Sequence, residues 1–128
     1  KKLIFLSTQK LNPRGKILIF TLDTFKNEIP TFLIMKKKLN KSLERDRKIL
    51  KSISKLFYKN SVKRFYFNVN ISKKKYIEMI KKRYISILLN LNQSDILEGT
   101  NEINTKYKKK IKFKDKLICI ILSNKLWK

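Results

Sequence analysis

LNPRGKILIFTLD, residues 11–23, joins a polar turn to a nearly unbroken apolar run. Pro13 disfavours helix at the residue before it, so the amphipathic segment at residues 1–11 is predicted to be a helix that ends at this turn. Residues 16–22 are apolar after the first lysine and rich in isoleucine, which predicts a strand covered on both faces in a parallel sheet. Gly15 is interpreted as a turn residue with a positive φ rather than as part of a cofactor loop. Helix, turn and buried strand together indicate an α/β fold.

Hydrophobic spacing predicts the elements beyond this strand, with a period of about 3.6 residues for a helix and about 2 for a strand. In chain order they are a helix from near Ser42 to near Asn60, a strand over residues 62–71, two or three helices between Ser72 and Lys110 with Ser94 as an N-cap, and a strand over residues 112–124. The chain shows no internal repeat, and its length fits one domain or a piece of one.

The charge of the chain is strongly positive. The 128 residues carry a formal net charge of +24, from 33 Lys and Arg against 9 Asp and Glu. A charge of this size indicates nucleic acid or an anionic surface as a partner. The basic residues are nearly all lysine, Asn and Ile are abundant and Ala is absent, a composition that a genome rich in A and T also produces. Composition alone leaves both explanations open.

Several classes of protein are disfavoured by what the sequence lacks. Without histidine, the chain lacks the commonest general base and the commonest metal ligand. The single cysteine, Cys119, lies in an apolar run and is predicted to be a packed thiol, which favours a reducing, cytoplasmic setting. No apolar stretch approaches the length of a membrane span. We therefore expect a cytoplasmic protein that makes no contact with a membrane.

The sequence resembles the second half of the class I S-adenosylmethionine-dependent methyltransferases of the bacterial small-molecule type. In that family the fifth strand follows a leucine and a Pro-Gly-Gly-like turn, which LNPRGKILIF matches except that Arg14 replaces the first glycine. The resemblance continues in three segments: IPTFLIMKKKLNKSLERDRKIL, SKKKYIEMIKKRYISILLNLNQSDILEGTNEI and IKFKDKLICIIL. The last of them contains the family's Phe-x-Asp pattern at Phe113 and Asp115.

The resemblance implies an α/β fold: a partial Rossmann-like methyltransferase sheet with an antiparallel last strand and a helical insertion before it. Residues 1–128 would then be a single C-terminal portion of a domain that transfers a methyl group from S-adenosylmethionine to a small-molecule acceptor. The family's Gly-rich cofactor loop and its ribose-binding acid belong to an N-terminal half that has no counterpart here. The chain also begins without Met, in the middle of an amphipathic segment. We therefore expect the fragment alone to be inactive.

Four residues are candidates for substrate contact in this interpretation. Asp23 follows the strand at residues 16–22, and ligands of open α/β sheets bind outside the carboxyl ends of strands. Tyr76, Arg83 and Tyr84 recur at near-helical spacing, and Arg83 could meet an acidic substrate group. The alternatives are a carboxylate that caps the next segment and a surface arginine between two partly buried tyrosines. IPTFLIM, from Ile29, is either a substrate lid or ordinary packing.

The alternative function is a small basic nucleic-acid-binding or ribosome-associated protein. Residues 106–116, KYKKKIKFKDK, have the charge pattern of a phosphate-binding segment. The alternative is that these lysines only keep a loop and the edge of a strand in contact with solvent, which gives the same pattern in the sequence. KRFYF, residues 63–67, interleaves basic and aromatic residues in the manner of a base-stacking sheet, but no RNP-like signature accompanies it. A partial sheet would also leave an unpaired edge.

Overall fold

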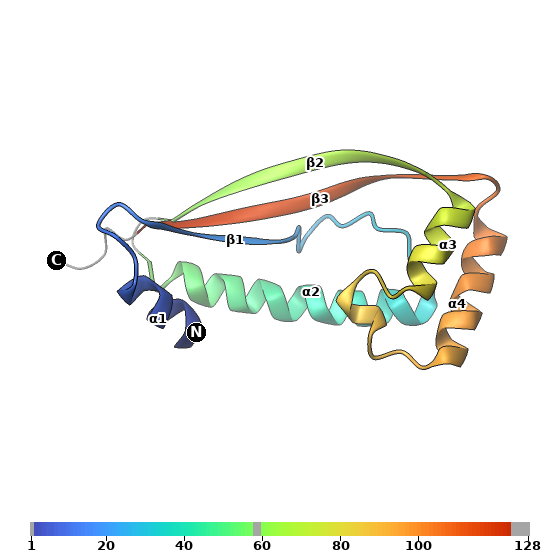
Figure 1. The fold of residues 1–128 in the computed structure, drawn as a ribbon, viewed down its shortest axis with the longest axis horizontal. Helices are drawn as coiled ribbons and strands as arrows, with labels where there is room; N and C mark the ends of the chain where they lie inside the picture. The colour runs from blue at the N-terminus through green and yellow to red at the C-terminus, as the bar shows by residue number, and fades with distance from the viewer. Residues whose placement is uncertain (1, 58–59, 124–128) are drawn as a thin grey trace. The chain divides into compact units, whose positions relative to one another are not determined.

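The computed structural model describes residues 2–57 and 60–123. They form a mixed α/β fold with four α-helices and a three-stranded antiparallel sheet (Figure 1). The elements are α1 (Lys2–Gln9), β1 (Lys16–Leu22), α2 (Leu33–Ser54), β2 (Asn60–Ser72), α3 (Lys73–Lys81), the 3₁₀ helix η1 (Ser86–Leu88), α4 (Gln93–Lys106) and β3 (Lys110–Ser123). Their order agrees with the order predicted from hydrophobic spacing.

The strands lie in the order β1-β3-β2. β1 pairs antiparallel with β3, with Lys16 opposite Ser123 and Leu22 opposite Leu117. The last strand is therefore antiparallel and follows a helical insertion, as predicted. The prediction that β1 is covered on both faces in a parallel sheet is wrong, because exposed and half-buried residues alternate along it. An antiparallel sheet can leave one face to solvent, and an unbroken apolar run does not reveal this.

The turn before β1 is tight, but it needs no unusual backbone angle. Gly15 donates its N–H to the carbonyl of Asn12 at 2.8 Å. Neither glycine has a positive φ, so that part of the prediction is wrong. A Cβ on Gly15 would instead lie 3.0 Å from the Asn12 carbonyl oxygen and 3.1 Å from the side chain of Leu11. Glycine is used here because there is little room for a side chain.

Helix α2 begins well before the predicted position near Ser42. Its first N–H, that of Leu33, donates to Glu102 Oε2 at 2.9 Å, a partner distant in sequence. Buried residues then recur at four-residue spacing: Met35, Leu39 and Leu43. At the other end, Asn60 Nδ2 donates to the Ser54 carbonyl at 2.9 Å, where the helix stops. The helix thus ends before the predicted Asn60, and residues 58–59 of that prediction lie outside the described residues.

Helix α4 is capped by Asn92 and not by the predicted Ser94. Asn92 Oδ1 accepts the Asp95 N–H at 2.7 Å, and Asp95 Oδ2 accepts the Asn92 N–H at 3.2 Å. This reciprocal capping box satisfies two N–H groups at the helix start. Ser94 supports the box by donating its hydroxyl to Asn92 Oδ1 at 2.7 Å.

The chain divides into two compact units. Unit 1 comprises residues 1–27, 44–66 and 116–128, of which the structure describes 2–27, 44–57, 60–66 and 116–123. Its core consists of Ile53, Ile120 and Leu122, against which Ile17 and Ile19 of β1 pack. One face of the unit 1 sheet is therefore covered by the C-terminal half of α2. Cys119 is buried in β3, which confirms its prediction as a packed thiol.

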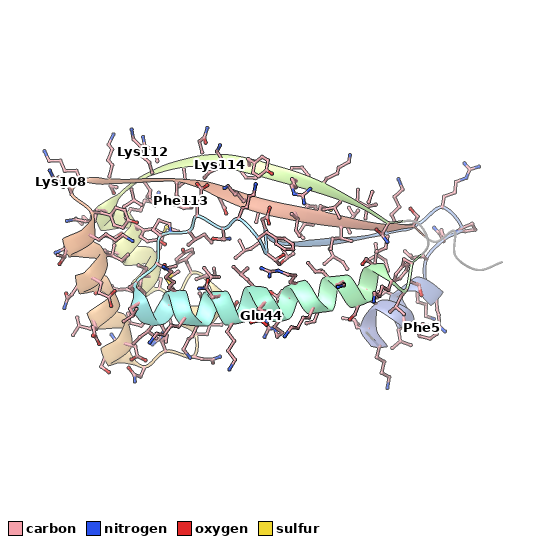
Figure 2. The ribbon with its side chains drawn as sticks, turned by 180° about the vertical axis from the view of Figure 1, so that it is seen from behind. Phe5, Glu44, Lys108, Lys112, Phe113 and Lys114 are labelled. Atoms are coloured by element: carbon pink, nitrogen blue, oxygen red, sulfur yellow. The ribbon has the colours of Figure 1, made fainter. Side chains whose placement is uncertain are left out.

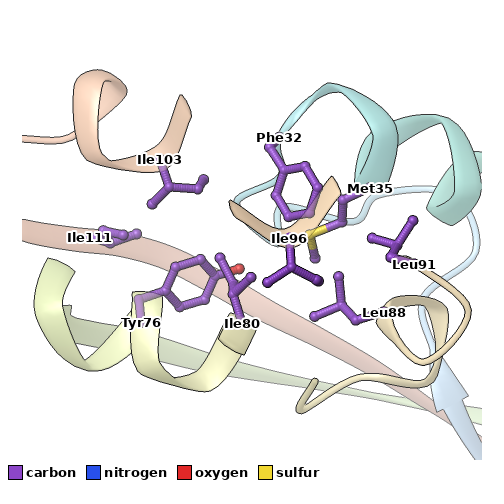
Figure 3. Close-up of a cluster of buried hydrophobic side chains, with 9 residues drawn as sticks. All are labelled: Phe32, Met35, Tyr76, Ile80, Leu88, Leu91, Ile96, Ile103 and Ile111. Carbon is purple, nitrogen blue, oxygen red and sulfur yellow. The ribbon is translucent and has the colours of Figure 1, made fainter. Parts of the chain in front are cut away.

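Unit 2 comprises residues 28–43 and 67–115. Figure 3 shows its core, which is built from nine buried residues: Phe32, Met35, Tyr76, Ile80, Leu88, Leu91, Ile96, Ile103 and Ile111. Phe32 packs so closely on α4 that a Cβ on Gly99 would lie 2.4 Å from two of its ring carbons. Helices α3 and α4 and the first half of β3 are held together by this core.

Candidate functional site

The first half of β3 has a charged side and an apolar side. Lys110, Lys112 and Lys114 are exposed, Ile111 is fully buried and Phe113 is half-buried against the unit 2 core. Figure 2 shows Lys112 and Lys114 on the side of the strand opposite to Phe113. Alternation along a strand explains this arrangement, because successive side chains point to opposite faces.

Two more exposed lysines precede the strand, and we call the five residues together the lysine row: Lys108, Lys109, Lys110, Lys112 and Lys114. None of the five has an ion-pair partner among residues 2–57 and 60–123. Two acids of unit 2 bind backbone groups instead. Glu28 Oε2 accepts the backbone N–H of Lys114 at 3.3 Å, and Glu102 caps the start of α2. Within the described residues, no carboxylate therefore forms an ion pair with a lysine of the row.

A second feature lies in unit 1, on the face of the sheet opposite to its core. Leu18 is 53% exposed, Phe20 is 62% exposed and Phe65 of β2 is 38% exposed. The rings of Phe20 and Phe65 lie 6.3 Å apart between centroids at an interplanar angle of 39°. Leu18 and Phe20 were missed in the sequence analysis because the run was treated as buried on both faces, and a run of apolar residues does not show which face is open.

Asp23, the first predicted site residue, is buried at the carboxyl end of β1 in unit 1. Its Oδ1 accepts the N–H of Phe25 at 2.9 Å, and its Oδ2 lies 3.9 Å from Nε of Arg64. The Arg64 side chain is 56% exposed, so solvent weakens this long ion pair. The carboxylate thus organises the turn after the strand. This is the capping role that was given as the alternative to substrate contact.

Tyr76 and Tyr84, two further predicted residues, are brought together in unit 2. The Tyr76 hydroxyl lies 2.6 Å from the Pro30 carbonyl, to which it donates, and 2.9 Å from the Tyr84 hydroxyl. Because Tyr76 has one proton to give, Tyr84 is the donor in the second bond. Burial raises the pKa of both phenols, so both remain neutral and can act as hydrogen-bond donors at neutral pH.

Arg83, the fourth predicted residue, lies at the end of α3 with a φ of 54°. Its Nη1 donates to the carbonyl of Leu88 and, at 2.7 Å, to that of Leu91. The guanidinium therefore holds the backbone around η1 in place. The structure places Arg83 with Tyr76 and Tyr84 in unit 2, whereas Asp23 belongs to unit 1.

The predicted lid segment from Ile29 contributes to the core of unit 2. Phe32 is 2% exposed and Met35 is fully buried, and both belong to the buried cluster of that unit. Beside it lies a shallow, open hollow of about 520 Å³, lined by Thr31, Glu98, Asn101, Glu102, Thr105 and Lys106. The sequence does not indicate this hollow, since its two glutamates and its asparagine look like ordinary exposed helix residues.

No family model, curated protein or solved structure matches this chain. Within the described part, no cluster of three or more His, Cys, Asp or Glu side chains is placed to hold a metal ion. None of the helices that the structure describes combines the length and the apolar character needed to cross a membrane. The functional argument therefore depends on the lysine row, the open face of unit 1 and the four predicted residues.

Proposed function

We propose that this chain is a nucleic-acid-binding protein and that the lysine row contacts the phosphate backbone. The observation that carries the proposal is the exposure of five neighbouring lysines without an ion-pair partner in the described residues. Lysines that bind phosphates release condensed counterions, which gives binding without sequence preference. A protein with a net charge of +24 also attracts a polyanion over a long range at low salt.

The spacing of the row suits an extended polyanion. Alternate residues of a strand recur about every 6.8 Å, so Lys110, Lys112 and Lys114 form a line and do not converge on one small anion. Ile111 and Phe113 fix this line, because their burial in the unit 2 core prevents the strand from rotating. The three strand lysines of the row are therefore held in a line by the core beneath them.

The test is the salt dependence of RNA binding. Lys112→Gln with Lys114→Gln should lower the slope of log affinity against log salt by about 1.4, since each lost phosphate contact removes about 0.7 on a single strand. The matched control, Lys36→Gln with Lys37→Gln, removes the same charge from exposed positions of α2 in the same unit and should change the slope little. Equal effects of the two pairs, or no binding of the parent protein at moderate salt, would overturn the proposal.

A second proposal is that the chain is part of a class I methyltransferase. The specific support is the antiparallel pairing of the last strand, β3, with β1 after a helical insertion. In this interpretation Asp23, Tyr76, Arg83 and Tyr84 contact a small-molecule methyl acceptor. Each of them already has a hydrogen-bond partner within the chain, so a substrate would have to share or replace those bonds.

The residues of this chain do not by themselves fit S-adenosylmethionine. The cofactor loop needs glycines that let the backbone approach a ligand. Gly15 lies before β1 against Leu11 and Asn12, and Gly99 lies beneath the ring of Phe32. To test the second proposal, the chain is expressed together with its upstream genomic sequence and titrated with the cofactor by calorimetry. A folded product that binds no cofactor would end it.

A further inference from the structure

The open face of the unit 1 sheet carries exposed aromatic rings flanked by lysines. We propose that Phe20 and Phe65 form a platform on which unpaired bases of single-stranded RNA stack. This inference rests on the proposed nucleic-acid binding and extends it, because it adds a contact that distinguishes single strands from duplexes. Stacking on aromatic side chains is how proteins hold unpaired bases without reading their sequence.

Strand geometry assigns the platform to one face. Ile17 and Ile19 pack into the unit 1 core, so the alternating residues Leu18 and Phe20 point to the opposite face. The 6.3 Å separation of the Phe20 and Phe65 ring centroids puts Phe65 on that same face. The β3 residue opposite Phe20 is Cys119, which is buried.

Charge favours a nucleic acid as the occupant of this face. Lys16 precedes Leu18 by two residues on β1, and Lys63 precedes Phe65 by two residues on β2. Because side chains two residues apart on a strand share a face, each lysine lies on the platform side of its strand. Each is about 6.8 Å along the strand from the next residue on that side. Both are exposed. A base on the rings would thus bring its flanking phosphates towards ammonium groups. A second copy of the chain is a poorer occupant, because it also carries a net charge of +24 and the two copies would repel each other.

The platform and the lysine row can be tested separately, because they are made of different residues in different units. The probe is a single-stranded oligouridylate that contains one 2-aminopurine, whose fluorescence is quenched when it stacks on an aromatic ring. Phe20→Leu with Phe65→Leu keeps the face apolar and removes the rings. We expect this double variant to lose about fivefold or more in affinity for the single strand. The quenching should disappear, and the salt slope should stay unchanged.

Two controls keep the result interpretable. Phe25→Leu removes a phenylalanine that is 71% exposed in the same unit but has Arg47 over its ring at 4.2 Å, and it should leave binding unchanged. Phe20→Tyr with Phe65→Tyr retains two aromatic rings and should retain both affinity and quenching. Duplex RNA of equal length should bind the parent and the leucine variant alike.

The outcomes separate this inference from the proposal on which it rests. If the leucine variant binds and quenches like the parent while the Lys112 and Lys114 substitutions weaken binding, the platform is overturned and phosphate binding stands. Equal losses for single strands and duplexes, or for the leucine and tyrosine variants, also overturn it. If the leucine substitutions change only self-association of the protein, the face is a protein contact. If the parent binds no RNA, both proposals fail.

Discussion

Gly99 is a residue whose identity is fixed by a single neighbour. It lies within α4, where glycine is a poor helix former, and the ring of Phe32 lies where its Cβ would be. Phe32 is itself 2% exposed and closes one end of the unit 2 core. The glycine is therefore a packing requirement of the contact between α4 and the start of α2 in that unit.

We predict that Gly99→Ala lowers the free energy of unfolding. The added Cβ would lie 2.4 Å from two ring carbons, and overpacking of this kind costs about 1–3 kcal/mol. The gain in helix propensity from glycine to alanine is only about 1 kcal/mol, so we expect the steric clash to outweigh it and the variant to be less stable. Urea unfolding measures the difference, and Asn101→Ala at an exposed position of α4 is the control, which should not destabilise. A Gly99→Ala protein as stable as the control would contradict the close contact.

Tyr76 shows how burial changes the chemistry of one side chain. Burial, followed by the neighbouring Tyr84, raises the pKa of its phenol above the ordinary value for tyrosine. The folded state therefore keeps a proton that the unfolded chain releases above about pH 10. Its contribution to stability is complete below that pH and is lost as the pH rises further, since the unfolded state then binds fewer protons than the folded state.

We predict that Tyr76→Phe makes the alkaline loss of stability less steep. Near pH 8 the variant should be less stable by about 1 kcal/mol, because it loses the hydrogen bond to the Pro30 carbonyl. Between about pH 9 and 11 the difference in free energy of unfolding between the two proteins should become smaller, since only the parent has this phenol to ionise. Urea unfolding of both proteins at a series of pH values gives the comparison. Parallel curves over this range would show that the Tyr76 proton is not linked to folding.

At the scale of the element, the spacing of apolar residues in the sequence predicted where the helices and strands lie, whereas contacts between residues distant in the sequence determine where they begin and end. β1 was predicted with its observed bounds because a Pro-Gly turn and a polar residue enclose it. The start of α2 was missed because its first N–H is capped by Glu102, far away in the sequence. For the candidate site, the lysine segment was visible in the sequence, whereas the Phe20 and Phe65 pair depends on which strands become neighbours.

We predict that Asn92→Ala destabilises the protein through α4. The Asn92 side chain accepts the Asp95 N–H at 2.7 Å, and loss of such an N-cap costs about 1 kcal/mol. Gln93→Ala, one residue later at an exposed position, is the control and should change stability little. The two variants are compared by urea unfolding monitored by circular dichroism. If Ser94→Ala proved more harmful than Asn92→Ala, Ser94 would be the true cap.

At the scale of the whole molecule, charge and apolar surface are distributed differently in the two units. Unit 2 combines the larger buried cluster with the lysine row, and unit 1 combines a small core with an open apolar face. Composition gave the sign and size of the charge but not this division, because it depends on how residues distant in the chain pair in the sheet. Several of the nine acids, among them Glu28, Asp95 and Glu102, accept backbone N–H groups. This agrees with the finding that no described residue forms an ion pair with the lysine row.

The alternation in the first half of β3 also restricts how this chain can change over time. An insertion or deletion of one residue between Lys110 and Asp115 would shift the rest of that stretch by one position. The lysine side chains beyond the change would then point towards the core, and the apolar side chains would point to solvent. Such an event would damage folding together with the proposed polyanion binding, whereas a point substitution can alter one and spare the other. Evolution of this segment should therefore proceed by replacement of residues and not by changes in its length.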